Sequence, residues 1–144
     1  QDRGEQLLQS MRDKIKKAQA LNQADTTLTA LVYGPNGFTA GKETIKSDAL
    51  LAAGLSNIAI DLGIKRYGNL SVEKVLKTNP DVIILDEQVP NQNSLAQDYV
   101  NHPVLKHVYA GKRRLQVPTP YWLCAGPSVA DAVLTLSRQL HEKK

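Results

Sequence analysis

The sequence predicts a three-layer α/β domain with a mostly parallel, Rossmann-like sheet, preceded by one long amphipathic helix. Two observations carry this prediction. Buried-strand patterns alternate with helical patterns along most of the chain, and turns rich in glycine and proline separate them. At 144 residues, with 42% hydrophobic and 22% charged residues, the chain has the size and composition of one globular core that needs no disulfide or metal to fold.

The first segment is expected to be a helix about 30 Å long, because apolar residues recur at spacings of three and four between Leu7 and Leu21. A strand at Leu28–Tyr33 follows and ends in the turn-forming run Gly34-Pro-Asn-Gly37. After this turn, Thr44–Ala53 is predicted to be a loop and helix that Gly54 closes.

The most informative stretch is a capped helix that runs without a spare residue into a buried strand. Ser71 is the expected N-cap, and Asn79-Pro80 ends the helix. Its apolar face comprises Val72, Val75 and Leu76. Val82–Leu85 is then predicted to be a strand covered on both faces. A shorter strand is expected upstream, at Asn57–Ile60.

The remaining elements follow the same alternation. A polar loop at Asp86–Asn93 leads to a helix at Ser94–Val100, which His102-Pro103 breaks before a turn of helix at Val104–Val108. The last strand is expected at Arg114–Val117, followed by an irregular segment over Pro118–Gly126. The final helix is marked by Pro127, Ser128 and Asp131 in its first turn and by an apolar face of Val129, Ala132, Val133, Leu136 and Leu140.

Composition and motif spacing exclude several classes of function. The net charge of +4 is modest, and Lys and Arg are scattered without interleaved aromatics, which argues against nucleic-acid binding. No apolar run is long enough to cross a bilayer. The single cysteine, Cys124, has the surroundings of a buried side chain, since Leu123 and Ala125 flank it.

The sequence also does not match the common motifs of nucleotide-binding, metal-binding and catalytic sites. The glycine-rich run from Gly34 to Thr44 has Asn36 and Glu43 where a phosphate-binding loop needs Gly and Ser or Thr. The three histidines have no zinc spacing, and no nucleophile elbow occurs. Asp86 and Glu87 form the only acid pair at a predicted strand end, but adjacent strand residues point to opposite faces. The chain is therefore not expected to be an enzyme.

Ligands of parallel α/β sheets gather outside the carboxyl ends of the strands. Here these are the loops after Tyr33, Leu85 and Val117. The candidate residues on them are Tyr33, Asn36, Phe38, Asp86, Glu87, Tyr121 and Trp122.

In wording as well as pattern, the run from Ser71 to Leu85 resembles a segment of the bacterial periplasmic solute-binding proteins that deliver ferric siderophores, haem or vitamin B12 to ABC importers. The match extends to Thr39–Thr44, to Asp48–Asn57, and to His102-Pro-Val-Leu with Gly111–Pro118. Gly126-Pro127 opens the last helix as it does in that family. The similarity covers nearly the whole chain in the right order.

The resemblance implies that this chain is the C-terminal lobe of a two-lobed protein. Residues 1–22 look like the connecting helix between the lobes, and residues 23–144 look like the substrate-binding lobe, with the N-terminal lobe absent. Glu73 matches the acidic residue that docks transiently onto arginines of the inner-membrane ABC permease. A periplasmic location follows, or an extracytoplasmic one with membrane association through the missing N-terminus.

The resemblance further implies an iron chelate, most simply a ferric siderophore, as transported ligand with no covalently bound cofactor; haem and vitamin B12 (cobalamin) stay open. Tyr67, Tyr121 and Trp122 suit a conjugated or catecholate ligand, while Lys42, Lys65 and Arg66 suit an anionic one. Tyr33, Phe38 and Glu73 complete the set of candidate functional residues. Trp122 suits a core position equally well. Two alternatives also stay open: an α/β enzyme or redox subunit centred on Asp86, Glu87 or the Gly34 loop, and an interaction module without ligand.

Overall fold

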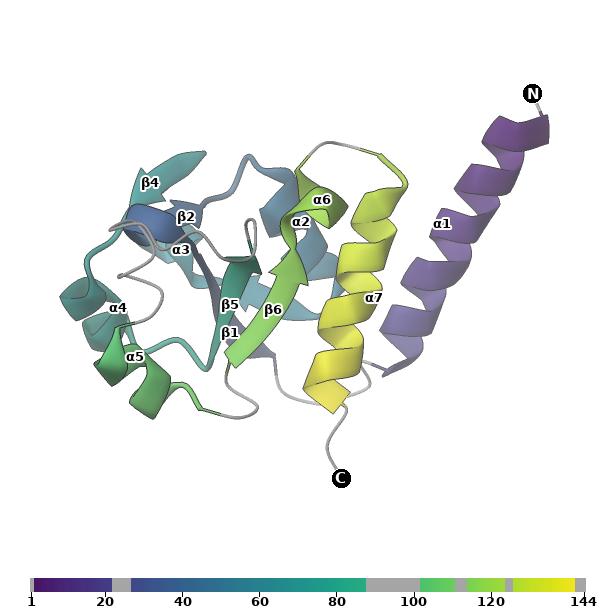
Figure 1. Ribbon diagram of the computed structural model, residues 1–144. Helices are drawn as coiled ribbons and strands as arrows, with labels where there is room; N and C mark the ends of the chain where they lie inside the picture. The colour runs from purple at the N-terminus through teal and green to yellow at the C-terminus, as the bar shows by residue number, and fades with distance from the viewer. Residues whose placement is uncertain (1, 22–26, 88–101, 111–113, 124–125, 142–144) are drawn as a thin grey trace.

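A computed structural model describes residues 2–21, 27–87, 102–110, 114–123 and 126–141. It confirms the three-layer α/β prediction (Figure 1). The main sheet contains β1 (Leu28–Tyr33), β3 (Leu55–Asn57), β5 (Val82–Glu87) and β6 (Arg114–Pro118) in the spatial order β3-β1-β5-β6. All three strand pairings in it are parallel. The strand order therefore reverses next to β1, which is where such sheets form ligand crevices.

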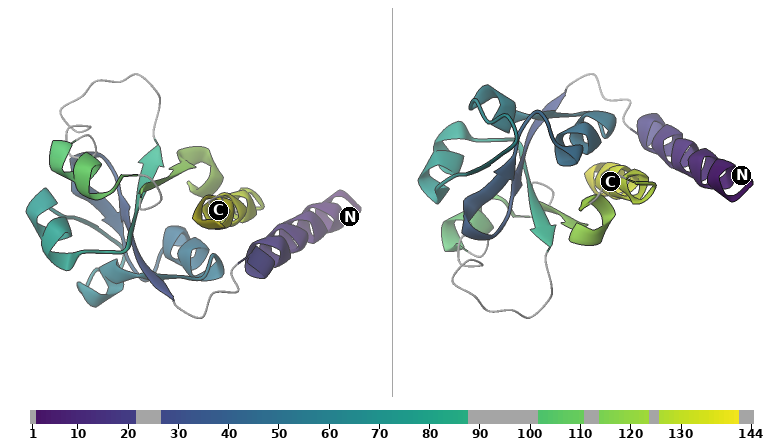
Figure 2. Two further views of the ribbon diagram at one scale, coloured as in Figure 1. Left: turned by 90° about the horizontal axis from the view of Figure 1, so that it is seen from below. Right: turned by 90° about the horizontal axis from the view of Figure 1, so that it is seen from above.

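Helices cover both faces of this sheet, because alternate strand residues feed two separate cores. One face packs under α2 (Ile45–Ala52) and α7 (Ser128–His141), and its strand contacts include Val32, Ile84 and Val117. The other face packs under α3 (Ile58–Asp61), α4 (Val72–Thr78) and α5 (Pro103–Val108). α1 (Asp2–Leu21) lies outside α7 as the outermost helix (Figure 2), and an ion pair of 2.6 Å between Lys14 and Asp131 joins the two.

Local signals explain most element boundaries. In α4 the Ser71 hydroxyl accepts a hydrogen bond from the Lys74 amide, and Asn79 ends the helix in the left-handed region at φ 50°. In α2 the Thr44 hydroxyl accepts from the Ser47 amide. The predictions of α1, α2, α4, α5, α7 and the strands β1, β5 and β6 are confirmed, with β5 extending two residues further, to Glu87.

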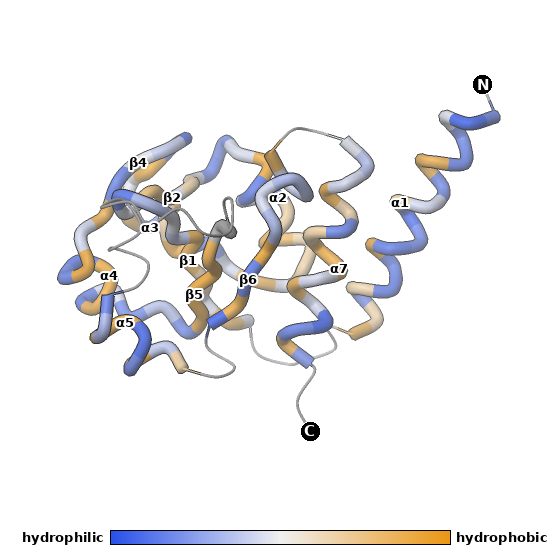
Figure 3. The backbone as a smooth tube through the Cα atoms, viewed as in Figure 1, coloured by the Kyte–Doolittle hydropathy of each residue, from blue (hydrophilic) through white to orange (hydrophobic). Residues whose placement is uncertain are grey.

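Figure 3, which colours the backbone by hydropathy, shows that the apolar strands lie between the two helical layers.

Three details differ from the sequence predictions. The strand expected at Asn57–Ile60 is wrong: β3 stops at Asn57, whose side chain accepts a hydrogen bond from the Ala59 amide and so caps α3. The segment expected to be irregular contains a short helix, α6 (Thr119–Trp122). A second, two-stranded antiparallel sheet joins β2 (Phe38–Ala40) to β4 (Tyr67–Asn69). The helix expected at Ser94–Val100 and the thiol of Cys124 lie outside the described residues.

Candidate ligand-binding site

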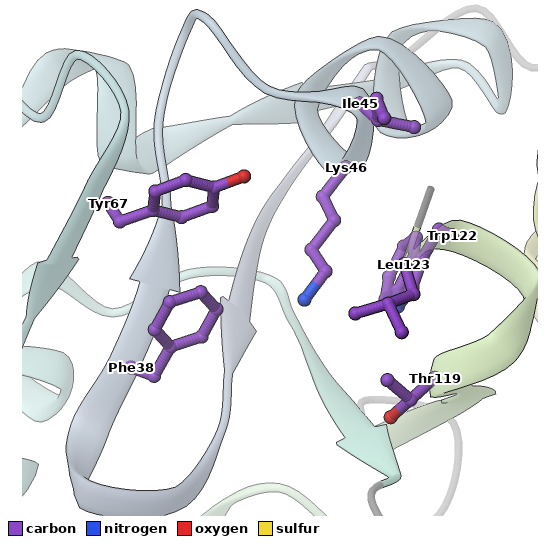
Figure 4. Close-up of a pocket in the computed structure, with 7 residues that line it drawn as sticks. All are labelled: Phe38, Ile45, Lys46, Tyr67, Thr119, Trp122 and Leu123. Carbon is purple, nitrogen blue, oxygen red and sulfur yellow. The ribbon is translucent and has the colours of Figure 1, made fainter. Parts of the chain in front are cut away.

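A pocket of about 240 Å³ lies beyond the carboxyl ends of β1 and β6 (Figure 4). One wall comes from the small sheet, because Phe38 begins β2 and Tyr67 begins β4. Their rings stack with centroids 5.4 Å apart and an angle of 24° between their planes. The opposite wall comes from α6 and the residue after it, with Thr119, Trp122 and Leu123.

A lysine stands between the two walls. Lys46, in the first turn of α2, is only 8% exposed, and Figure 4 shows its side chain extending into the space between the aromatic rings. Its ammonium lies 4.9 Å from the centroid of Phe38 and 5.6 Å from that of Trp122. Both rings thus offer a cation–π contact to the same charge. Ile45 completes the lining.

The aromatic wall is fixed by backbone contacts behind it. The Gly37 carbonyl accepts a hydrogen bond of 2.8 Å from the Leu70 amide, and the Tyr33 hydroxyl donates one of 2.9 Å to the Leu70 carbonyl. Gly37 has φ +75°, and a Cβ there would stand 2.1 Å from the Leu70 carbonyl oxygen. Only glycine fits this approach, so the Phe38 strand and the α4 entry are locked together.

The structure brings three of the predicted ligand residues together and separates the others. Phe38, Tyr67 and Trp122 line the pocket. Tyr33 is fully buried in the core under α4, and Tyr121 packs partly buried against the other core. Trp122, 1% exposed, belongs both to the pocket and to that core.

The exposed cations predicted for the ligand lie on two paired segments next to the small sheet. The Gly41 amide donates to the Arg66 carbonyl at 2.6 Å, and the Lys42 amide donates to that of Ile64. The Arg66 guanidinium also pairs with Glu43 at 3.3 Å. Lys42 and Arg66 are exposed outside the pocket lining.

Sequence reasoning missed four of the lining residues: Ile45, Lys46, Thr119 and Leu123. Lys46 carried one usable signal. A cation in the first turn of a helix is opposed by the helix dipole, and a local rule broken in this way often marks a functional position.

Glu73 lies apart from the pocket on the exposed first turn of α4. Its carboxylate meets Lys77 at 3.2 Å, but both side chains are more than 70% exposed. Such a surface pair contributes little and leaves the carboxylate accessible to another cation.

Neither a metal centre nor a membrane segment stands out in the described ranges. Within them, no three His, Cys, Asp or Glu side chains gather as a metal site would require. None of the helices described has the length and apolar content needed to cross a membrane.

Burial lowers the pKa of the Arg114 guanidinium, at the start of β6, below its ordinary value.

Comparison with known families decides what kind of protein has this architecture. The family described as "Periplasmic binding protein" matches residues 1–115. The chain belongs to this family. Its members are solute-binding transport proteins rather than enzymes, and those of known structure that resemble this chain include components of ABC importers for iron-related ligands.

Solved structures agree with this assignment. The apo periplasmic heme-binding protein RhuT from Roseiflexus sp. RS-1 shares 25% identity at a TM-score of 0.74, over 98% of this chain and 56% of that one. An ABC-type Fe3+-hydroxamate transport protein from Saccharomonospora viridis shares 24% identity, with a TM-score of 0.76 over 96% and 49% of the two chains. No curated protein matches the sequence.

A third structure, Helicobacter pylori CeuE with Ni(II) bound, shares 20% identity and has a TM-score of 0.74, over 94% of this chain and 45% of that one. At this identity the likeness concerns the fold. This periplasmic binding protein chain thus spans about half the length of the solved structures that it matches.

Proposed function

We propose that this chain is the C-terminal lobe of a two-lobed binding protein that carries an iron chelate to an ABC permease. The observation that carries the proposal is the aromatic pocket at the carboxyl ends of β1 and β6 in a chain of this family. On this proposal residues 1–22 form the connector between lobes, and residues 23–144 form the binding lobe. The protein works in the periplasm, or outside the cytoplasm with a membrane attachment elsewhere in the polypeptide.

The shape of the pocket fits half of a ligand site. Its volume, about 240 Å³, falls below the roughly 300–1,000 Å³ of typical small-molecule sites. Its rim includes two large side chains that remain mostly exposed, Tyr67 at 62% and Leu123 at 66%. A second lobe closing over this rim would enlarge the site and remove both side chains from water, as hinged binding proteins do on closure.

The proposed ligand is a ferric siderophore, and haem is the alternative within the same proposal. The relatives support this range, since one is a heme-binding protein and another is an Fe3+-hydroxamate transport protein. Stacked aromatic rings bind flat conjugated surfaces well. The test is a fluorescence titration of the full-length polypeptide with ferric hydroxamate, ferric catecholate, haem and cobalamin. Because Trp122→Phe removes the single tryptophan of this chain, the affinity of that variant is measured by calorimetry. Saturable quenching by one chelate, which the variant binds more weakly, supports the proposal, whereas a flat response to all four contradicts it.

Glu73 is the proposed permease contact. A carboxylate in a first helical turn is favoured by the helix dipole and stays available to an arginine of the partner. Glu73→Arg should leave chelate affinity unchanged and reduce iron uptake by cells that depend on this protein. Asp61→Arg is the matched control, because Asp61 is also an exposed acid but lies on a different helix, α3. Cells with this variant should take up iron normally. Equal uptake by the two variants would remove Glu73 from the docking surface.

A further inference from the structure

The outer edge of β6 is occupied by a side chain of α7, because Gln139 bonds there to the backbone of Gln116. We infer that Gln139 takes the place of a neighbouring strand, and that it keeps a second copy of this chain from adding its own β6 to the sheet. This role does not depend on which ligand the pocket binds.

The first step is the exposure of the strand edge. Among the described residues β6 is the last strand on its side of the main sheet, and its only strand partner there is β5. Backbone groups of alternate residues along a strand point to opposite sides, so those of Arg114, Gln116 and Pro118 share one side. This side faces away from β5, because both backbone groups of Gln116 bond to α7. An outermost strand with free backbone groups is a template on which another strand can pair.

The second step is the geometry of the contact, which reproduces a pair of sheet hydrogen bonds. The Gln116 amide donates to the side-chain oxygen of Gln139 at 3.0 Å, and the side-chain nitrogen of Gln139 donates to the Gln116 carbonyl at 2.6 Å. Two opposed residues of an antiparallel ladder exchange the same two bonds. Glutamine can do this because its amide carries a donor and an acceptor, as a peptide group does.

The third step is the support that α7 gives to this amide. The helix packs beside β6 (Figure 1). Leu136, almost one turn before Gln139, belongs to the same buried core as Val117 of β6. Gln139 itself is half-buried. A competing strand must therefore displace a side chain that the packing of its helix already holds at the edge.

A second copy of the chain fits this edge, because the edge is complementary to itself. In an antiparallel pair centred on Gln116, the two Gln116 residues would exchange the two backbone bonds that Gln139 now makes. The two Arg114 residues would lie four residues apart along the pair, about 13 Å, which exceeds the screening length of about 8 Å in physiological salt. Each Arg114 would face Pro118, which has no N–H to donate. The pairing is therefore weak, and one side chain is enough to prevent it.

The experiment compares the full-length polypeptide with Gln139→Ala and Gln139→Ser by sedimentation equilibrium. Protein concentrations reach about 1 mM, where contacts worth about 4 kcal/mol become visible. The serine variant is included because a polar replacement excludes association through a new apolar patch. Arg138→Ala is the matched control, since Arg138 is the exposed neighbour of Gln139 on the same helix.

Two additional measurements locate any association at the β6 edge. Gln116→Pro, added to each Gln139 variant, removes the outward N–H at the centre of the proposed pair. Proline is tolerated on an outermost strand where its nitrogen faces away from the partner strand. Hydrogen exchange of the Gln116 amide, followed by NMR in dilute protein, reports whether the edge has opened.

The average mass of both Gln139 variants should rise with concentration above that of the native protein, whereas Arg138→Ala should match the native protein throughout. In dilute protein the Gln116 amide should exchange roughly 2- to 13-fold faster in both variants, the equivalent of 0.5–1.5 kcal/mol for one hydrogen bond. Adding Gln116→Pro should return both variants to the native mass.

Variants whose mass follows that of the native protein overturn the inference, even if Gln116 exchanges faster, because the open edge would then not pair. Association that persists with Gln116→Pro also overturns it, since such association would come from unfolding or from another surface. Unchanged exchange of the Gln116 amide would show that Gln139 does not hold this edge.

Discussion

The contact between Gly37 and Leu70 gives the most direct test of how the aromatic wall is held in place. Replacing Gly37 by alanine forces a Cβ into a space where the Leu70 carbonyl oxygen lies 2.1 Å away, with its carbonyl carbon at 3.1 Å. These are backbone atoms, so no flexible side chain can swing aside. One of the two segments must move, and with it the hydrogen bonds that join them.

The expected cost has two parts. An alanine held at φ +75° loses about 1–2 kcal/mol relative to glycine. The displacement also threatens the hydrogen bonds from the Leu70 amide to Gly37 and from Tyr33 to the Leu70 carbonyl, each worth about 0.5–1.5 kcal/mol. The total loss in the free energy of unfolding is therefore about 2–5 kcal/mol.

Gly63→Ala is the matched control, because Gly63 has φ +81° but no atom lies within 4 Å of the place that an added Cβ would take. It should lose only the conformational part, about 1–2 kcal/mol. Urea unfolding followed by circular dichroism measures both variants, with equal m-values as the condition for comparing midpoints. Equal destabilisation of the two variants would refute the steric account of the Gly37 contact.

Two further predictions concern stability. Asn57→Ala should cost about 2–4 kcal/mol in urea unfolding, because the buried amide donates to the Ala40 carbonyl at 2.9 Å and accepts from the Ala59 amide at 3.1 Å; a loss below about 1 kcal/mol would contradict these roles. Gly4→Ala should raise stability by up to about 1 kcal/mol, since the α1 position is exposed and open around its Cβ; any loss of stability would show that α1 is not helical there.

Elements were predictable where several local signals coincide. The unit from Ser71 to Leu85 combines a cap, an apolar face, a left-handed stop and a buried strand, and each signal is local. Ile58–Ile60 misled the strand prediction because its β-branched residues favour strands, whereas the Asn57 side chain, by capping, selects a helix. β2 and β4 are three residues long, too short for a period of two to be recognisable.

The candidate site shows the same division. Phe38 and Trp122 stood out as aromatics in loops after predicted strands, and Tyr67 stood out through the family resemblance; the pocket lining includes all three. Their grouping around Lys46 depends on contacts between segments far apart in sequence, from β2, β4, α2 and α6. Local sequence patterns do not indicate contacts between distant segments. Tyr33 illustrates the converse, since a strand-end tyrosine can equally turn into the core and hydrogen-bond a backbone carbonyl there.

The central claim is that the pocket between Phe38 and Trp122 binds an iron chelate, and chemical-shift mapping tests it most directly. The chain contains a single tryptophan, so one indole N–H resonance reports on this pocket. On titration with gallium forms of the catecholate and hydroxamate chelates, we expect saturable shifts of that resonance and of the amides of Phe38, Lys46 and Tyr67, with α4 unaffected. Shifts confined to other surfaces, or none at millimolar chelate, would contradict the account.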